Sequence, residues 1–119
     1  MENTLIQYLY RDADNYKVQN ECVIKGVLSE EDIQTILDSL EDDEVFIPRL
    51  VGLPEKRFDT YDPQVDHPFF ELEKTSFIIT DQHPTVEITA AELVSAFRKA
   101  KEHWHMIMPE RVLELLNTL

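Results

Sequence analysis

The sequence has little cysteine, little glycine and no long hydrophobic run. Its 119 residues include one cysteine and two glycines. A lone cysteine cannot close an intramolecular disulfide, which predicts a reducing, cytoplasmic location. Two glycines are too few for a loop that cradles phosphate, which argues against nucleotide hydrolysis. The apolar runs fall far short of the roughly 20 residues of a membrane helix, so we expect no membrane insertion.

Positive charge is also scarce. The chain carries 11 Lys and Arg against 24 Asp and Glu, a formal net charge of −13. Residues 29–73 contain 14 of the acids and three bases, which gives this region a net charge of −11 (3 − 14). Such a surface repels phosphate backbones and anionic lipid, which argues against direct nucleic-acid binding. It favours a basic protein partner, or else it serves only to keep the protein soluble.

Apolar residues make up 43% of the chain, which is enough for a single domain over residues 1–119. Runs of β-forming side chains predict strands over residues 4–11, 21–27 and 70–80. Within the last of these, Phe77, Ile78 and Ile79 are the best core candidates. We therefore expect an α+β fold, a small and mainly antiparallel sheet of three to four strands packed with two to three helices.

Capping residues mark the starts of two helices. Ser29 is followed by three acids, which suit the positive end of a helix over residues 30–40. Thr89 and Glu92 form a capping box at the start of a helix over residues 90–104. Apolar residues recur at helical spacing in both segments, so each helix should bury one face against the sheet.

The segment between the first helix and the third strand is rich in proline. Residues 45–68 contain four of the six prolines in the chain, which excludes long regular elements. Apolar residues in this segment need a surface on which to pack, which predicts a long ordered loop.

The candidate binding residues are acids in and before this loop, together with two tyrosines near the first turn. They are Glu41, Asp42, Asp43, Glu44, Asp59, Asp62, Asp66, Tyr10 and Tyr16. The alternative interpretation is that the loop is a lid over the sheet and that the tyrosines belong to the rim of the core.

An Asp-His-Pro motif at residues 66–68 is followed by a similar motif, Asp-Gln-His-Pro, at residues 81–84. The interpretation we favour is two turns, in each of which an acid caps the turn and proline fixes its exit. The alternative is a small metal-dependent hydrolase built on Asp66, His67, Asp81 and His83. No two histidines lie four residues apart, and the alternate-residue spacing of a calcium loop is absent. We therefore expect no cofactor.

The end of the chain has its own apolar stripe. Pro109 fits the first position of a short helix. Val112, Leu113, Leu116 and Leu119 fall on one side of that helix. This stripe would dock either on the core or on another subunit, so homo-oligomerisation through it is one expectation.

Three blocks of the sequence resemble the landmarks of a family of small uncharacterised bacterial proteins. The blocks are YLYRDADNYK at residues 8–17, FIPRLVGLP at residues 46–54 and DHPFFE at residues 66–71. The resemblance implies one bacterial or phage-derived cytosolic domain and no assigned activity. Some members carry a second histidine just after the Asp-His pair, where this chain has Phe69 and Phe70. That departure weakens the case for a histidine-rich metal site.

These observations favour a non-enzymatic protein-interaction module, such as a regulator, an immunity protein or an inhibitor. The acidic region over residues 29–73 would contact a basic partner. In a sharper version, its carboxylates imitate the phosphates of a nucleic acid and occupy the basic groove of a nuclease or defence complex.

Overall fold

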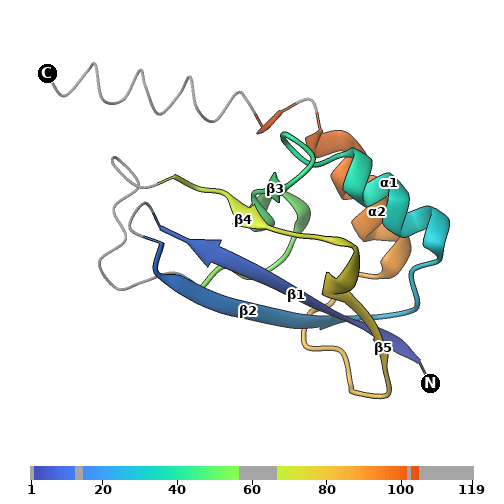
Figure 1. The fold of residues 1–119 in the computed structure, drawn as a ribbon. Coiled ribbons are helices and arrows are strands. Elements are labelled where there is room, and N and C mark those ends of the chain that lie inside the picture. The colour runs from blue at the N-terminus through green and yellow to red at the C-terminus, as the bar shows by residue number, and fades with distance from the viewer. Residues whose placement is uncertain (1, 13–14, 57–66, 102, 105–119) are drawn as a thin grey trace, which may run out of the picture.

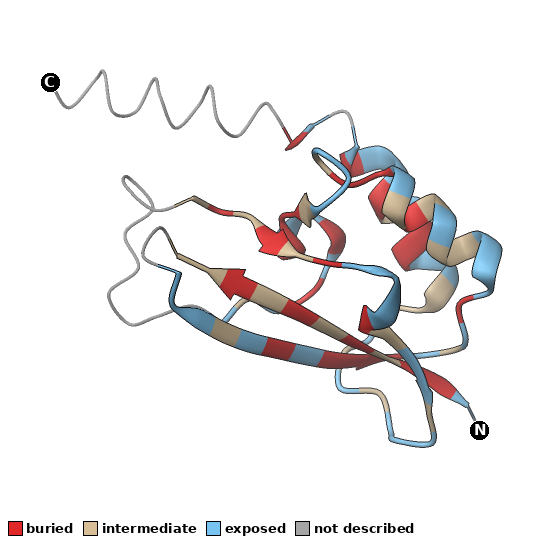
Figure 2. Cartoon of the chain, in the orientation of Figure 1, coloured by how far each residue is buried: buried red, intermediate tan, exposed pale blue. Residues whose placement is uncertain are grey.

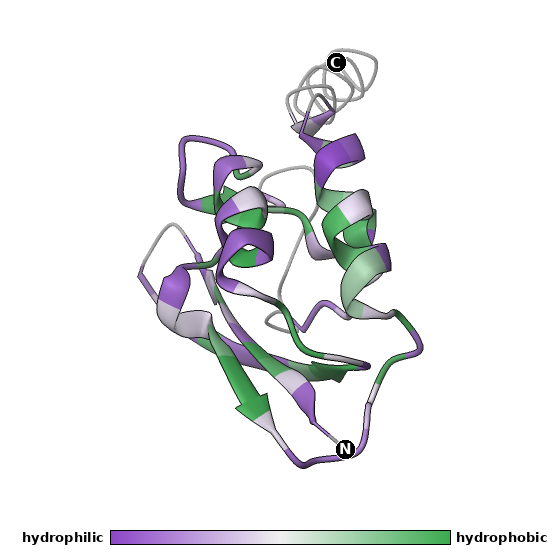
Figure 3. Cartoon of the chain, turned by 90° about the vertical axis from the view of Figure 1, so that its right-hand side faces the viewer, coloured by the Kyte–Doolittle hydropathy of each residue, from purple (hydrophilic) through white to green (hydrophobic). Residues whose placement is uncertain are grey.

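The computed structural model describes residues 2–12, 15–56, 67–101 and 103–104. Within these residues the fold is a mainly antiparallel five-stranded sheet with two helices, which confirms the expected α+β class. Both helices lie on the same side of the sheet, as two views at right angles show (Figures 1 and 3). None of the helices in this part of the chain is long and apolar enough to cross a membrane.

The first strand of the chain, β1 (Asn3–Arg11), is the centre of the sheet. On one edge it pairs antiparallel with β2 (Lys17–Ile24). Two short strands, β4 (Phe70–Glu71) and β5 (Phe77–Thr80), share its other edge, and both are antiparallel to it. β3 (Val45–Phe46) pairs with β4. The first two predicted strands are therefore present and form an antiparallel pair, although the second begins and ends earlier than expected.

The predicted third strand is interrupted by three extra residues. Phe70 in β4 lies opposite Tyr10, whereas Phe77 in β5 lies opposite Ile6, so the register shifts by three residues (77 + 6 against 70 + 10). The extra residues, Lys74–Ser76, form a 3-10 turn. Because side chains alternate along a strand and three is odd, this insertion lets both phenylalanines face the same side of the sheet.

Two apolar side chains of β5 are uncovered. Ile78 and Ile79 are 42% and 59% exposed, whereas Phe77 is half-buried against the core. β1 is the one strand that pairs with β5 among the described residues, so β5 forms an edge. The prediction that both isoleucines belong to the core is therefore wrong.

The core lies between the sheet and the helices (Figure 2). Ile6, Tyr8 and Tyr10 project from β1 towards the helices and are at most 1% exposed. A continuous row of aromatic rings, with centroids 5.1 to 6.2 Å apart, connects the sheet to the end of the second helix. The row consists of Tyr10, Phe70, Tyr8, Phe46, Phe97 and Trp104.

The two helices, α1 (Glu30–Asp38) and α2 (Ala90–Ala100), begin at the predicted caps. In each capping box a hydroxyl accepts a hydrogen bond from a backbone N–H three residues on, and the carboxylate there accepts one in return. The pairs are Ser29 with Asp32 and Thr89 with Glu92. Both helices end earlier than predicted, which places Trp104 beyond α2.

Side chains of the sheet hold the described part of the proline-rich loop in place. The Tyr8 hydroxyl donates to the Pro54 carbonyl at 2.5 Å. The Asn20 amide donates to the Lys56 carbonyl at 3.0 Å and accepts from the Lys56 N–H at 2.7 Å. Residues 45–56 contain β3 and the 3-10 turn Pro48–Val51. Residues 57–66 lie outside the described part of the chain, so one long ordered loop over residues 45–68 stays a prediction.

We expect the substitution Asn20→Asp to destabilise the fold by about 1 to 3 kcal/mol, the cost of leaving buried polar groups unpaired. Asn20 is 6% exposed, and its amide nitrogen donates to the carbonyls of Lys56 and Val18. A carboxylate has no hydrogen to donate and would face both oxygens. Urea unfolding measures the change.

Gln19→Glu on the exposed side of the same strand is the matched control, because it makes the same change in charge. We expect it to alter stability by less than about 0.5 kcal/mol. Equal effects of the two substitutions would show that added charge, and not the lost hydrogen bonds, determines the result.

Candidate functional site

An open groove with a volume of about 1030 Å³ lies between α1 and the insertion that separates β4 from β5. Acidic side chains dominate its charged lining: Asp38, Asp43, Glu44, Glu71 and Glu73, against Arg11 and Lys74. Five acids and two bases give this lining a formal charge of −3 (2 − 5). We call it the acidic groove.

A tight turn supplies two of these carboxylates. The Glu41 N–H donates to the Val45 carbonyl at 2.8 Å. Between these residues, Asp42 and Asp43 have φ angles of 51° and 60°. Two successive left-handed residues are what a type I′ hairpin turn requires, and aspartate tolerates this conformation better than most residues. The run of four acids therefore forms a turn after α1, and it presents Asp43 and Glu44 to the groove.

The opposite side of the groove carries an ion pair. The Arg11 guanidinium donates from Nε to Glu71 Oε2 at 2.7 Å and from Nη2 to Glu71 Oε1 at 3.3 Å. Arg11 also donates to the side-chain oxygen of Asn15. Hydrogen bonding to Glu71 raises the pKa of Arg11. Because both side chains of the pair are more than a third exposed, it orients these groups and adds little to stability.

The other acids of the groove have short local contacts or face solvent. Gln34 Nε2 donates to Asp38 Oδ1 at 2.8 Å, and the Thr75 hydroxyl donates to Glu73 Oε1 at 2.8 Å. Each carboxylate has further acceptor positions for an incoming donor. Lysine and arginine make their strongest hydrogen bonds with such ionised acceptors. The arrangement is therefore suited to binding cations by charge and hydrogen bonding.

Four predicted binding residues, Glu41 to Glu44, lie together on the turn after α1, and two of them line the acidic groove. Tyr10 is 1% exposed, and its hydroxyl donates to the His67 carbonyl at 3.0 Å, so it supports the core and the loop. Tyr16 is 67% exposed, next to the turn that joins β1 and β2. Asp59, Asp62 and Asp66 lie outside the described residues.

Asp38, Glu71 and Glu73 fall within the acidic region over residues 29–73 but were not among the predicted binding residues. A local signal for the groove does exist. Phe70 and Phe77 are an odd number of residues apart, and Glu73 to Thr75 is a polar run between them. Such a break in an apolar alternation is typical of a bulge, and bulges redirect the side chains next to them.

His67 uses both ring nitrogens to hold the backbone. Its Nε2 lies 2.6 Å from the Arg11 carbonyl, and its Nδ1 accepts from the Phe69 N–H at 3.2 Å. A carbonyl only accepts, so the hydrogen of the neutral ring is on Nε2. Neither nitrogen can bind a metal ion while these hydrogen bonds are present.

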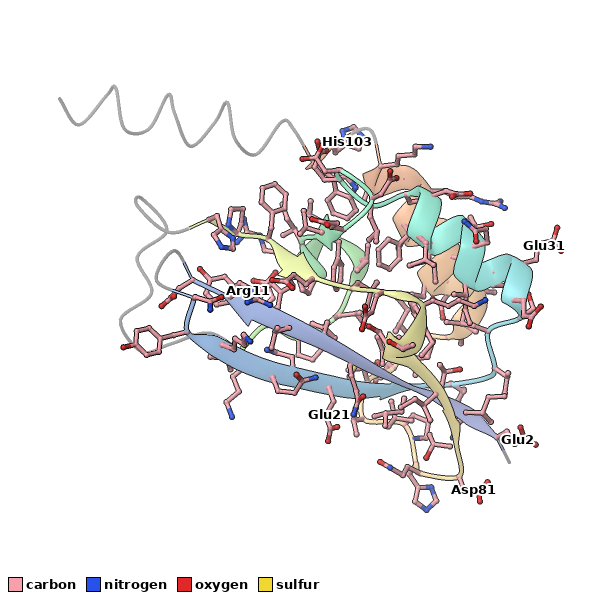
Figure 4. The ribbon with its side chains drawn as sticks, viewed as in Figure 1. Glu2, Arg11, Glu21, Glu31, Asp81 and His103 are labelled. Carbon is pink, nitrogen blue, oxygen red and sulfur yellow. The ribbon has the colours of Figure 1, made fainter. Side chains whose placement is uncertain are left out.

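The structure places His67 and Asp81, one described residue from each Asp-His motif, far apart. The His67 ring is hydrogen-bonded to the backbone carbonyl of Arg11, the last residue of β1. Asp81 follows Thr80, and Thr80 pairs with Asn3 at the start of β1. Eight residue steps of about 3.3 Å separate these ends by about 26 Å. Figure 4 shows the labelled Arg11 and Asp81 at opposite ends of the sheet.

His83 is an exposed residue in the segment that follows β5, near Asp81. Asp66 lies outside the described residues. In the part of the chain that the structure describes, no three His, Cys, Asp or Glu side chains are placed to hold a metal ion. A single metal site that includes both His67 and Asp81 is therefore not favoured, and the hydrolase alternative stays a prediction.

Cys22 is a buried free thiol that is 2% exposed. Burial raises its pKa to about 11, and the neighbouring Tyr8 side chain partly opposes this change. The pKa of Tyr8 is raised as well, mainly by its own burial. A thiol in this state is protonated at neutral pH and is a poor nucleophile.

The predicted oligomerisation residues Val112, Leu113, Leu116 and Leu119 lie outside the described residues.

No family model matches the chain, and neither the curated proteins nor the solved structures contain a match to it. The resemblance to a family of small bacterial proteins therefore stays a prediction from the three sequence blocks.

Proposed function

We propose that the protein is a non-enzymatic interaction module that binds a basic protein partner in the acidic groove. The observation that carries the proposal is the lining of this groove by five carboxylates and two bases. These carboxylates come from α1, the turn after it, β4 and the insertion after β4. Groups fixed on several elements of a sheet and helix layer are already in position before a partner arrives, which lowers the entropy cost of binding.

The charge supports a basic partner over other ligand classes. The formal net charge of −13 speeds the approach of a cationic surface, and the groove then offers specific acceptors. Within this proposal the protein acts as a regulator, an immunity protein or an inhibitor. Mimicry of nucleic acid is the sharper form, in which the carboxylates take the place of phosphates in the partner's basic groove. A reducing, cytoplasmic location is part of the proposal and is supported by the one buried free thiol.

Affinity capture from a lysate of the native host at low salt tests the proposal, followed by titration of the captured partner. A short labelled peptide of alternating lysine and serine serves as a direct probe of the groove. We expect the affinity for both to fall steeply between about 0.1 M and about 1 M salt, because the Debye length drops from about 10 Å to about 3 Å. Affinity that does not change with salt would reject the proposal.

A triple neutralisation of the groove, Asp43→Asn, Glu44→Gln and Glu73→Gln, should weaken probe binding about tenfold, since each exposed ion pair contributes about 0.2 to 1 kcal/mol. Asparagine at position 43 also tolerates the left-handed backbone.

The matched control neutralises Glu2, Glu21 and Glu31, three exposed acids that do not line the groove (Figure 4). It makes the same change in net charge and should weaken binding less than about threefold. Equal losses in the two triple variants would show that total charge, and not the groove, governs binding. For the mimicry form, duplex DNA should compete with this protein for the captured partner.

A further inference from the structure

A second groove, with a volume of about 480 Å³, lies along α2. Small side chains of the helix, Ser95, Ala96 and Ala100, line it together with Leu50 from the 3-10 turn Pro48–Val51. Leu50 is 38% exposed, one of the few large apolar side chains on the described surface. Glu92, Lys99 and His103 complete the lining. We call it the α2 groove.

The last residues that the structure describes, His103 and Trp104, lie at this groove or next to it in sequence. His103 lines the groove, and the next residue, Trp104, is 1% exposed. The Trp104 indole N–H donates to the Ser39 carbonyl at 2.6 Å, and this hydrogen bond fixes the position of Trp104 against the end of α1. Fifteen residues follow (119 − 104). They start next to a partly apolar surface.

The sequence of this segment suits such a surface. Val112, Leu113, Leu116 and Leu119 fall on one side of a helix that Pro109 can start. Glu110 and Glu114 fall on the opposite side. A helix with one apolar face is stable only when that face is covered, because a short isolated helix is marginal in water.

The lengths of the groove, of a helix over residues 109–119 and of the linker before it would allow that helix to run back along α2. The eight steps from Glu92 to Ala100 cover about 12 Å of α2, and a helix over residues 109–119 would be about 16 Å long. The four residues 105–108 can span up to about 14 Å. Packed helices lie about 8 to 10 Å apart, so this linker is long enough for an antiparallel helical hairpin.

We propose that residues 109–119 dock in the α2 groove of their own chain, with the apolar stripe against Leu50, Ala96 and Ala100. The tether favours docking within the chain over docking on a second copy, because a short linker holds the segment at an effective concentration in the millimolar range. The small side chains of Ser95, Ala96 and Ala100, which line this groove, allow close approach of the second helix.

Disulfide trapping tests this docking. In a Cys22→Ala background, the pair Ser95→Cys and Leu116→Cys places one thiol in the groove and one in the stripe. Under mild oxidation we expect a disulfide within one chain, formed at least about tenfold faster than in the control pair, because docking holds the stripe at the groove side of α2 and so raises the local concentration of one thiol at the other. The control pair is Arg98→Cys with Leu116→Cys, because Arg98 is exposed on α2 and does not line the groove. Equal rates, or a disulfide between two chains, would overturn the proposal.

A second measurement does not depend on new cysteines. Leu113→Asp with Leu116→Asp should shift the NMR methyl signals of Leu50 and Ala96, because it removes the stripe that covers them. The matched control, Asn117→Asp with Thr118→Asp, adds the same charge outside the stripe and should leave these signals in place. Unchanged signals in the first variant would also overturn the proposal.

Discussion

Replacing Trp104 with alanine should reduce the free energy of unfolding by about 3 to 5 kcal/mol, the range for deletion of a large buried aromatic side chain. Trp104 is 1% exposed and packs edge-to-face against Phe97, with the ring centroids 6.2 Å apart. Its indole N–H donates a hydrogen bond to the Ser39 carbonyl. It thereby joins the end of α2 to the end of α1. Domains of this size have only about 5 to 15 kcal/mol of total stability, so the loss would be severe.

Trp104→Phe separates the two contributions. The phenyl ring keeps part of the apolar contact but leaves the buried Ser39 carbonyl without its donor, at a cost of about 1 to 3 kcal/mol. Tyr16→Ala is the control for an exposed aromatic side chain and should change stability by less than about 0.5 kcal/mol. Trp104 is the only tryptophan, so unfolding should be followed by circular dichroism. A loss below 1 kcal/mol for Trp104→Ala would contradict the assigned role.

Stability should also fall as pH rises from about 9 to about 11. Burial raises the pKa of Cys22 to about 11, above its ordinary value of 9.0. A thiol whose folded pKa lies above its unfolded pKa contributes stability that is complete below about 9 and is lost as pH rises to the folded value. Two pKa units correspond to about 2 to 3 kcal/mol at most. The raised pKa of Tyr8 adds a loss of the same sign above about pH 10.

Urea unfolding at several pH values measures this loss. Cys22→Ala removes the thiol. The free energy of unfolding of this variant should therefore begin to fall about one pH unit later than that of the parent protein, at the pH where Tyr8 begins to ionise in the unfolded chain. The comparison uses the slope of stability against pH, because the substitution also creates a small cavity with its own constant cost. Parallel slopes for the two proteins between pH 8 and pH 10 would show that Cys22 does not cause the decline.

The features that could be predicted from sequence depend on residues close together in the chain. The caps at Ser29 and Thr89 predicted both helix starts, and runs of β-forming side chains predicted the strands that became β1 and β2. In each case the atoms that decide the structure lie within a few residues of one another. The α+β class followed from these elements.

The features that could not be predicted depend on contacts between distant segments. Phe77, Ile78 and Ile79 all favour strands, and only the place of β5 at the edge of the folded sheet decides that the last two are exposed. β5 begins 66 residues after the end of β1, the strand with which it pairs (77 − 11). Composition alone does not place the insertion.

The candidate site shows the same division. Charge counting located the acids within residues 29–73, and the fold selects which of them meet at the acidic groove. Asp43 and Glu44 meet Glu71 and Glu73 there because β4 brings the two segments together. The two Asp-His motifs are alike in sequence, but their described residues His67 and Asp81 lie at opposite ends of β1.

The central position of β1 has a consequence for synthesis. β1 is complete at Arg11, and its hairpin partner β2 follows at once, but its other neighbours begin 59 residues later, at Phe70 (70 − 11). At translation rates of about 5 to 20 residues per second, that delay is about 3 to 12 s. Through this interval the nascent hairpin presents an open row of amides and carbonyls, which a chaperone or a neighbouring chain can cover until β4 and β5 emerge.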